Sequence, residues 1–566
     1  MKNLKEDHIK KEKNIMKMSK ITNYLLLGIL ATSFAGCNKN HNSSSNNNGG
    51  SSHNYTFADV NQINDDLERD ENGEFTTDYL ENIQINMWSV IGDPDKTTLL
   101  DLVKKFNQEY AGSIEIVVTS VGHYDYYNAL DNTRANEIKN FPDVCFMHNE
   151  KNLEYAVKGY FYPVDEIIDK VGIDLNFDNV YDNIERTTLF DNKHFGIPVD
   201  AHGYLTQLRQ DIIKKNNLGF DNNTRYIPKN AQEYNALIEG LGSLAKSGEL
   251  WTRNINANAD HSWYQLKTGN SKLPSSVTSN DFFPIFDLYQ ENDALTALYT
   301  NGGSLLGEDG KVSFHKNEGF VKYVTNQVDL YNRQIMGSGK DDSSEGGSKE
   351  AMFANGSTVM FSEGPWQSAG VYDLLWNNNQ LKTAGTLGVT SEDANDPVYR
   401  EPFAVCRVEG WWADSTAPAE LANKYYGNGH VITISDRVTS LAKAAAALEF
   451  ARWYTQEVND NGDYYLSTWC KAGHIPAWKN VYESASFKAV AESNKIVKAL
   501  GNPEDIIALE STEYATLLID GIKTAVTNVQ AQLQSSSGCT VEQAKSTITA
   551  VANSTQDALE LLNLGF

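Results

Sequence analysis

The sequence predicts an α/β fold built on a parallel sheet with covering helices. Three short apolar segments alternate with two amphipathic segments between residues 83 and 147, which gives the order β-α-β-α-β. The chain has 566 residues, of which 40% are hydrophobic, so it has room for two or three domains with ordinary cores. No internal repeat is found along the chain.

The first strand and helix follow from hydrophobic periodicity. Ile83, Ile85 and Met87 alternate with polar residues and lead into Trp88, which predicts a strand. Residues 98–110 predict an amphipathic helix, because their apolar residues recur on one helical face (Leu99, Leu102, Val103 and Phe106).

The later elements continue the same alternation. A strand is expected at residues 114–118, a helix at 127–138 and a third strand at 143–147. Further alternating elements are expected at 212–218 and 231–246, and long helices at 441–457, which is rich in alanine, and at 511–533.

The N-terminal segment predicts export and lipid attachment. Lys17 and Lys20 precede an apolar run over residues 24–37, which is the layout of a secretory signal peptide and is shorter than the roughly 20 residues that span a bilayer. Phe34-Ala35-Gly36-Cys37 resembles a bacterial lipobox, in which the Cys receives a diacylglycerol. We expect a signal peptide at 1–36, lipidated Cys37 and a membrane anchor; the alternative is an uncleaved apolar helix.

A flexible tether is expected at residues 37–81. Residues 38–54 are Asn, Ser, Gly and His with almost no apolar side chain, so they cannot form a core. Residues 55–81 are acidic and weakly patterned, and are either further linker or a short helical addition.

The charge of the chain limits its partners. Residues 1–36 hold seven Lys and three acidic residues, so their removal changes the formal net charge from −26 to −30. Such an acidic protein repels nucleic acid, which is therefore not expected as a partner.

The cysteines predict no metal site. Cys145, Cys406, Cys470 and Cys539 are widely spaced and form no Cys-x-x-Cys or Cys/His pattern. Disulfides and buried free thiols both remain open. No metal and no cofactor is expected.

Enzyme motifs are incomplete. Ser243–Lys246 and Ser440–Lys443 fit S-x-x-K, and Lys267–Gly269 fits K-T-G, but the S-D-N triplet of the penicillin-recognising enzymes is missing. No pair among the many carboxylates is marked as a glycosidase pair. We therefore expect no catalytic residues.

A series of short motifs resembles the extracellular solute-binding proteins of ABC importers, in the group that binds maltose and oligosaccharides. The resemblance runs from about residue 83 to the C-terminus. Its motifs are Phe141–Val144, Lys158–Val164, His194–Pro198, Pro228–Leu244, Gly307–Phe314, Phe353–Met360 followed by Glu363–Trp366, and Gly473–Ala477.

This resemblance implies a two-lobed periplasmic-binding-protein fold with three interlobe crossings, near residues 198–204, 357–366 and 431–436. The N-terminal lobe is expected to hold 82–200 and 367–431, and the C-terminal lobe 201–366 and 432–566. The protein is expected to be a monomer with ABC permease subunits as partners.

The resemblance also directs attention to side chains that suit a sugar. Aromatic rings cover the C–H faces of a sugar, and planar polar groups bind its hydroxyls. In the related proteins the Trp at the position of Trp366 stacks on the sugar. The other candidates follow strand ends or expected crossings, where ligands of α/β proteins gather. The set is Trp88, Asp93, Tyr124, Asn149, Glu150, Asp200, His202, Glu363, Trp366, Trp411, Tyr426, Asn428 and His474.

The expected function is capture of a carbohydrate, specifically an oligosaccharide, at the outer face of the membrane, without chemistry on the ligand. The alternative, from another class, is a lipid-anchored glycoside hydrolase or a surface glycan-adhesion protein.

Overall fold

The computed structural model describes residues 55, 57–255, 262–266, 282–286, 290–333, 335–337, 349–365, 396–408, 410–509, 512–535 and 537–563. The chain forms two compact units, residues 55–552 and residues 1–54 with 553–566. Of the latter, the described part is the end of the last helix, α21 (Val541–Asn563). The account below concerns residues 55–552.

The first sheet confirms the predicted alternation. Its strands lie in the order β2 (Ile114–Ser120), β1 (Ile83–Ser89), β3 (Val144–His148), β16 (His430–Ile434) and β6 (Ile197–Pro198). β1 is parallel to β2 and β3, whereas β16 is antiparallel to both β3 and β6. A strand from late in the sequence therefore lies in the middle of a sheet that the early strands begin.

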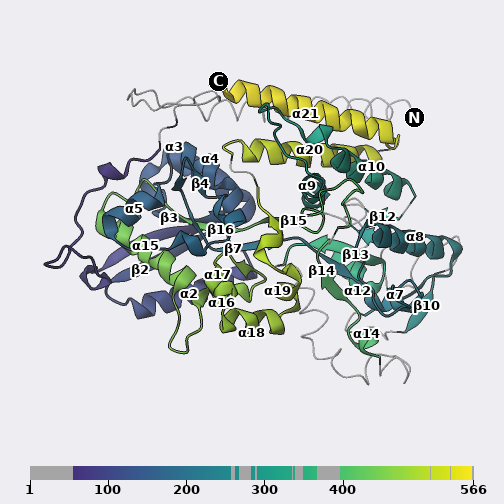
Figure 1. Ribbon diagram of the computed structural model, residues 1–566, viewed down its shortest axis with the longest axis horizontal. Helices are drawn as coiled ribbons and strands as arrows, with labels where there is room; N and C mark the ends of the chain where they lie inside the picture. Colours follow the sequence, from purple (N-terminus) through teal and green to yellow (C-terminus); the bar gives the residue numbers. More distant parts are fainter. Residues whose placement is uncertain are drawn as a thin grey trace, which may run out of the picture. The chain divides into compact units, whose positions relative to one another are not determined.

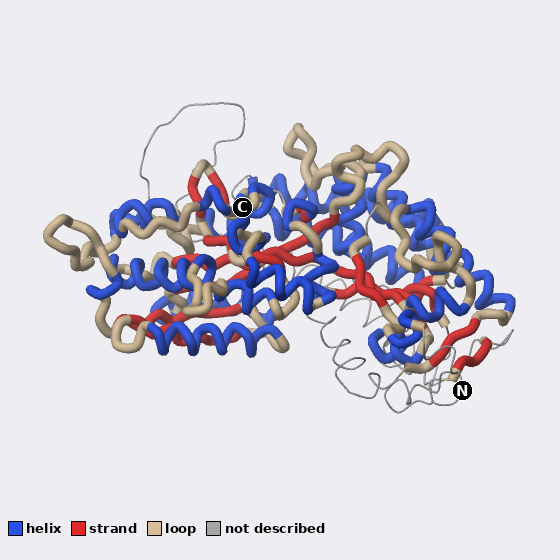
Figure 2. The backbone as a smooth tube through the Cα atoms, turned by 60° about the horizontal axis from the view of Figure 1, so that its bottom comes forward, coloured by secondary structure: helices blue, strands red, loops and turns tan. Residues whose placement is uncertain are grey.

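Helices lie on both sides of the strands (Figure 2). Around the first sheet they are α2 (Asp95–Glu109), α3 (His123–Asn136), α4 (Asn152–Val157), α5 (Val164–Val171), α15 (Leu441–Gln456) and α16 (Tyr465–Cys470). The alanines 444–447 of α15 are fully buried, and their small side chains let the helix pack closely against β1. We call the first sheet and these helices the first lobe.

The second sheet has the order β12 (Met336–Gly337), β11 (Phe283–Phe286), β13 (Thr358–Glu363), β8 (Leu205–Leu208) and β14 (Ala404–Cys406). Its helices are α7 (Gln210–Lys215), α8 (Ala231–Ser247), α9 (Gln290–Thr300), α10 (Glu318–Asn332), α12 (Lys349–Asn355) and α14 (Pro397–Arg400). Phenylalanines dominate one of its core clusters (Phe283, Phe286, Phe353, Phe361 and Phe403). This sheet and its helices form the second lobe.

A four-stranded sheet connects the two lobes. Its order is β17 (Ile475–Pro476), β7 (Asp200–Gly203), β15 (Tyr425–Asn428) and β18 (Ile506–Ile507). Along the chain β7 lies between β6 of the first lobe and β8 of the second, and β15 lies between β14 and β16. Figure 1 shows β7 and β15 between the two groups of strands.

The remaining elements are short connections and C-terminal helices. They are η1 (Val60–Gln62), η2 (Thr77–Tyr79), η3 (Ile138–Asn140), η4 (Asn149–Lys151), η5 (Phe177–Asn179), α6 (Asp182–Glu185), β4 (Leu189–Phe190), β5 (Lys193–His194), β9 (Trp251–Arg253), β10 (Trp263–Gln265), η6 (Phe314–Lys316), α17 (Lys479–Tyr482), α18 (Ala485–Ser493), α19 (Lys495–Leu500), η9 (Pro503–Asp505) and α20 (Ala515–Leu533). Among the described residues, no helix is both long and apolar enough to cross a membrane.

The expected tether is shorter than predicted. Val60, Ile63 and Leu67 are buried in the main core, and the Asn64 N–H donates to the carbonyl of Thr439 at 2.8 Å. Residues 57–81 therefore belong to the fold, because their few apolar side chains are spaced to cover the first lobe. Of the two alternatives for residues 55–81, the structure agrees with a short helical addition, since this part holds η1 and η2.

The strand pairing also corrects the expected lobe segments. β14 was placed in the N-terminal lobe by its sequence position, but it pairs with β8 in the second sheet. β16 and α15 were placed in the C-terminal lobe, but β16 pairs with β3 and β6, and α15 packs on β1. The passage predicted at 431–436 lies earlier, in β15, because β16 is already a strand of the first sheet.

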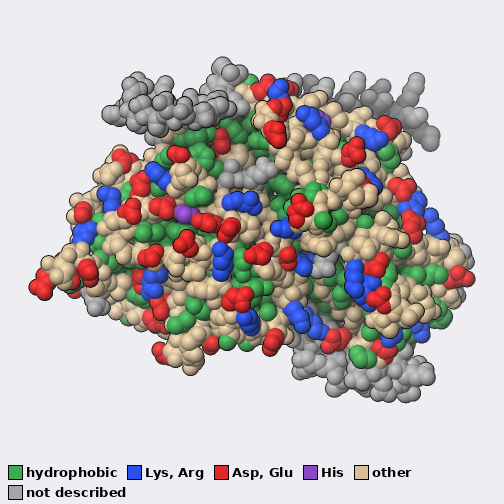
Figure 3. All heavy atoms as spheres, viewed as in Figure 1, with side chains coloured by type: hydrophobic (Ala, Val, Ile, Leu, Met, Phe, Trp, Pro, Cys, Tyr) green, Lys and Arg blue, Asp and Glu red, His purple; other side chains and the backbone are tan. Residues whose placement is uncertain are grey.

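The four cysteines 145, 406, 470 and 539 are buried free thiols in this structure. On the face shown in Figure 3, Lys and Arg side chains lie singly or in small groups among Asp and Glu side chains. The negative net charge is thus accompanied by mixed charges on that face.

Candidate functional site

The carboxyl edge of the first sheet gathers residues that the sequence singled out. β1, β2 and β3 are parallel, so their carboxyl ends meet at one edge, and β16 begins at the same edge because it is antiparallel to β3. β6 ends there and continues into β7. The predicted residues found together at this edge are Asn149, Glu150, Asp200, His202, Tyr426, Asn428 and His474.

Asp200 lies at the centre of this group and is fully buried. Its carboxylate accepts hydrogen bonds from the backbone N–H of His430 at 3.0 Å, from His430 Nδ1 at 2.9 Å and from Trp469 Nε1 at 2.5 Å. The strand register explains the proximity, since Val431 is opposite Pro198 and therefore places His430 beside the start of β7.

Two further histidines complete the cluster. Nδ1 of His202 and Nδ1 of His474 each lie 3.6 Å from a carboxylate oxygen of Asp200. His474 also contacts Asp95, whose Oδ2 lies 3.2 Å from its Nε2, and its ring stacks on Trp469 with centroids 4.7 Å apart. We call Asp200, His202, His430 and His474 the Asp–His cluster; all four side chains are buried.

The charges of this cluster are strongly coupled. Burial opposes the ionised form of Asp200, but the nearby His430 and His474 outweigh it and hold the pKa of Asp200 well below its usual range. Burial lowers the pKa of His202 to about 4, which the contact with Asp200 only partly offsets. Burial also lowers the pKa of His474, yet the charges of Asp200 and Asp95 raise it above the ordinary value.

A half-exposed rim lies beside the Asp–His cluster. The Tyr426 hydroxyl donates to Glu150 Oε2 at 3.1 Å, and the Asn149 N–H donates to the carbonyl of Gly429 at 2.9 Å. Asn428 is opposite His202 in the pairing of β15 with β7. Glu150 and Asn428 are partly exposed, so the rim contains carboxylate and amide groups that a polar ligand can reach.

Burial separates the predicted residues into two sets. Asp200, His202 and His474 were expected to face a ligand, but in this structure they are covered and contact one another. Of the rim residues, Glu150 and Asn428 are partly exposed, whereas Asn149 and Tyr426 are buried. Burial of Glu150 raises its pKa, although Lys151 and Tyr426 oppose the shift.

The end of β1 contributes a different residue from the one expected. Trp88 is half-buried and packs on the core of the first lobe. Asp93 is exposed, whereas Asp95 is buried and contacts His474. Asp95 faces inwards because it begins α2, and the contact of Asp93 with a ligand stays a prediction.

Trp411 lies in the second lobe, where it is packed. Its Nε1 donates to the carbonyl of Pro228 at 3.0 Å, and its ring stacks on Tyr234 with centroids 4.7 Å apart. Glu363, at the end of β13, is fully buried, and its Oε1 accepts from the N–H of Gly364 at 2.8 Å.

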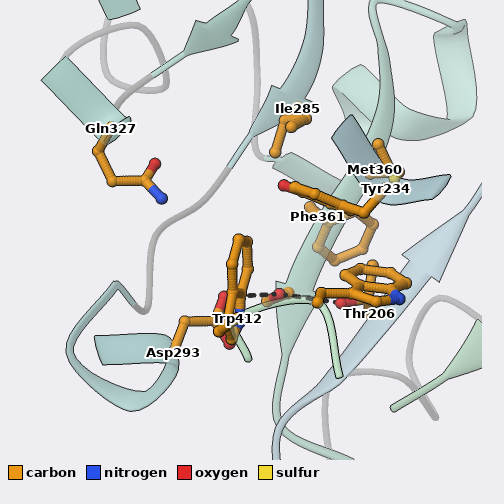
Figure 4. Close-up of a pocket in the computed structure, with 10 residues that line it drawn as sticks. Thr206, Tyr234, Ile285, Asp293, Gln327, Met360, Phe361 and Trp412 are labelled. Atoms are coloured by element: carbon orange, nitrogen blue, oxygen red, sulfur yellow. Dashed lines mark hydrogen bonds between the residues drawn. The ribbon is translucent and has the colours of Figure 1, made fainter. Parts of the chain in front are cut away.

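A small cavity adjoins Trp411 (Figure 4). Thr206, Ser362 and Asp293 form a line of hydroxyl and carboxylate groups along it, with separations of 3.2 and 3.4 Å. Its volume of about 10 Å³ matches one water molecule and is far below the several hundred Å³ of ligand pockets. The aromatic residues around Trp411 therefore pack as a core at this cavity, and the contact of Trp411 with a ligand stays a prediction.

Three predicted residues lie outside the described part. They are Cys37, Trp366 and the side chain of Tyr124.

The structure also adds residues that the sequence did not suggest. His430 is the first residue of β16 and lies opposite His148, with ring centroids 5.3 Å apart. Asp95 is the second addition. A polar residue at the start of a buried strand was the available signal for His430; nothing in the local pattern marks Asp95.

Comparison with known proteins identifies the class of chain. The sequence model of a family described as bacterial extracellular solute-binding protein matches residues 101–495. No curated protein matches the chain.

Solved structures are similar in fold. UgpB from Mycobacterium tuberculosis, in complex with glycerophosphocholine, has a TM-score of 0.59 at 12% identity, with 85% of this chain and 99% of that chain covered. The GacH receptor of Streptomyces glaucescens, solved unliganded and with acarbose, has a TM-score of 0.58 at 15% identity, with 84% of this chain and 98% of that chain covered. An ABC substrate-binding protein from Listeria monocytogenes, in complex with cycloalternan, has a TM-score of 0.57 at 15% identity, with 84% of this chain and 99% of that chain covered.

Proposed function

Because this chain belongs to the family of bacterial extracellular solute-binding proteins, we propose that it captures a carbohydrate, specifically an oligosaccharide, outside the membrane and delivers it to an ABC permease. The observation that carries the choice of ligand is the rim beside the Asp–His cluster, where the carboxylate of Glu150 and the amide of Asn428 are partly exposed and the buried Tyr426 hydroxyl donates to Glu150. Such planar polar groups bind pairs of sugar hydroxyls.

The similar structures support this choice. Two of them hold acarbose and cycloalternan, which are oligosaccharides, and one holds glycerophosphocholine. Trp366, by its place after Glu363-Gly364-Pro365, is proposed to stack on the sugar. The protein binds and releases its ligand unchanged, as a lipid-anchored monomer attached through Cys37.

Calorimetry against a panel of oligosaccharides and glycerophosphocholine tests the proposal, with product analysis on the same samples. We expect micromolar binding of an oligosaccharide with no product. Release of shorter sugars would establish the alternative, a glycoside hydrolase. Binding of glycerophosphocholine alone would retain solute capture and reject the carbohydrate.

Variants locate the site. Glu150→Gln removes a charged acceptor and is expected to weaken binding about tenfold, since a hydrogen bond to a charged group contributes about 1.5–3 kcal/mol and 1.4 kcal/mol is tenfold. Trp366→Ala should weaken binding more. Glu483→Gln, on an exposed side chain just after α17, is the control. Equal affinities for Glu150→Gln and Glu483→Gln would place the ligand away from the rim.

A further inference from the structure

The Asp–His cluster has the composition of a metal site. One ligand atom from each of Asp200, His202, His430 and His474 lies within 4.8 Å of the others. All four side chains are nine-tenths or more buried. Three imidazoles and one carboxylate are the donor types that Zn²⁺ binds in proteins.

The separations fit one small ion. Bonds of about 2.0–2.1 Å in a tetrahedral arrangement place ligand atoms roughly 3.3 Å apart. The Nδ1 atoms of His430 and His474 lie 2.9 and 3.6 Å from Oδ2 of Asp200, and the Nδ1 atom of His202 lies 3.6 Å from Oδ1 of the same carboxylate. All the ligand atoms lie within 4.8 Å of one another, so binding one ion requires the most distant pair to approach by at most roughly 1.5 Å.

Two residues outside the Asp–His cluster orient its side chains for binding a metal ion. Histidines that bind metals usually donate their second ring N–H to a carboxylate. His474 fits this pattern, because its Nε2 faces Asp95 at 3.2 Å and its Nδ1, which faces Asp200, has no hydrogen-bond partner although it is buried. Buried nitrogen atoms in proteins normally have a hydrogen-bond partner, which Nδ1 of His474 lacks. Trp469 in turn fixes the Asp200 carboxylate.

The charges also balance. A divalent ion with neutral histidines would be offset by the carboxylates of Asp200 and Asp95, which makes the buried group electrically neutral. Nitrogen donors exclude Mg²⁺ and Ca²⁺, which take oxygen ligands. Four protein ligands leave no open position, which is the arrangement of a structural rather than a catalytic zinc site.

We propose that Asp200, His202, His430 and His474 bind one Zn²⁺ ion in a closed structural site. The ion displaces the protons held at the facing imidazole nitrogens and ties together the start of β7, the start of β16 and the residue before β17. These three segments join the first sheet to the four-stranded sheet, so the metal stabilises the connection between the lobes. The proposal is independent of the ligand that the rim binds.

The test uses the full chain stripped with a chelator and then titrated with Zn²⁺ or Co²⁺. We expect one equivalent to bind, the strong visible absorption of tetrahedral Co²⁺ to appear, and the melting temperature to rise when metal is restored. His474→Gln and His202→Gln should lower the affinity at least 100-fold, whereas His315→Gln, in η6 of the second lobe, should bind as the wild type does.

Several results would overturn the site. They are stoichiometric binding that both cluster variants retain, a Co²⁺ spectrum of octahedral type, or a stripped wild-type protein that takes up no metal and keeps its melting temperature. If a cluster variant fails to fold, the spectrum and the melting shift of the wild-type protein alone decide, because both are measured without any substitution.

Discussion

Asp211 is enclosed by two arginines in the core of the second lobe. Arg209 donates to it through Nε and Nη2 at 2.8 and 2.9 Å, and Arg253 donates through Nε at 2.7 Å. All three side chains are fully buried. Burial favours the protonated form of Asp211, but the two guanidinium groups outweigh it and lower its pKa. The group persists because each charge has a fixed partner.

Asp211→Asn should therefore destabilise the protein strongly. It leaves two buried guanidinium groups without their counter-charge, and breaking a buried ion pair costs about 3–5 kcal/mol. Urea unfolding measures the loss. Asp329→Asn, which removes an exposed partner of Arg333, is the control and should cost less than about 1 kcal/mol. Equal losses for the two variants would show that the buried cluster contributes no more than a surface pair.

The surroundings of His194 predict that the stability of the fold depends on pH. It lies 2.9 Å from Asp165 and 3.0 Å from Glu185 and stacks on Phe177. Burial lowers its pKa, but the two carboxylates outweigh this and raise it above the ordinary value. Since the folded pKa exceeds the unfolded one, its stabilisation is present below about pH 6.5 and is lost as the pH rises through the folded pKa.

Urea titrations from about pH 5 to about pH 9 test this expectation. The difference in unfolding free energy between wild type and His194→Gln should be largest at the acidic end, of order 1–3 kcal/mol for hydrogen bonds to charged groups, and should shrink as the pH rises. A difference that is constant with pH would mean that folding leaves the pKa of His194 unchanged.

At the residue scale the sequence predicted part of the candidate site. Asp200 and His202 follow the Gly196-Ile197-Pro198 motif, and a recognised motif identifies the residues next to it in the sequence. His430 and Asp95 were not predicted, because their positions depend on the pairing of β16 with β6 and on the packing of α2. Long-range register of this kind leaves no local pattern.

Among the elements, β7 and β15 approach each other closely. A Cβ atom on Gly429 would lie 2.2 Å from the carbonyl oxygen of Asp200, and one on Gly427 would lie 2.7 Å from that of His202. Both obstacles are backbone atoms, which cannot rotate away. Glycine is therefore required where the chain passes from the four-stranded sheet into β16.

Gly429→Ala should separate these strands. The clash with the Asp200 backbone disturbs the β7 pairing, and overpacking of this kind costs about 1–3 kcal/mol or more. Thermal unfolding of Gly429→Ala beside Gly92→Ala makes the comparison, since a Cβ on Gly92 meets nothing within 4 Å. Equal melting temperatures would mean that the two strands can move apart without loss.

Secondary structure was predicted well and lobe membership was not. The strand at 114–118 is found as β2 (Ile114–Ser120), and the helix at 441–457 as α15 (Leu441–Gln456), because each has its own hydrophobic period. Periodicity does not show which sheet a strand joins. β14 and β16 were therefore assigned to the wrong lobes.

For the whole molecule, the proposed lipid attachment at Cys37 can be tested in cells. Cys37→Ala removes the thiol that would carry lipid, and the variant should appear in the medium or periplasm. Fractionation followed by detection of the protein measures this, with Cys539→Ala as the matched cysteine control. Membrane attachment of Cys37→Ala equal to that of Cys539→Ala would favour an uncleaved helix.

The central position of β16 determines when the first sheet can be completed during synthesis of the chain. The first sheet cannot be completed until His430–Ile434 has been synthesised, because this strand lies between β3 and β6. At about 5–20 residues per second, the ribosome needs roughly 15–60 s to proceed from His148 to His430. During that interval β3 lacks its neighbour β16 and the first sheet is incomplete, and an export channel accepts chains that have not completed their fold. Moving β16 forward by circular permutation would shorten the interval and make folding compete with export.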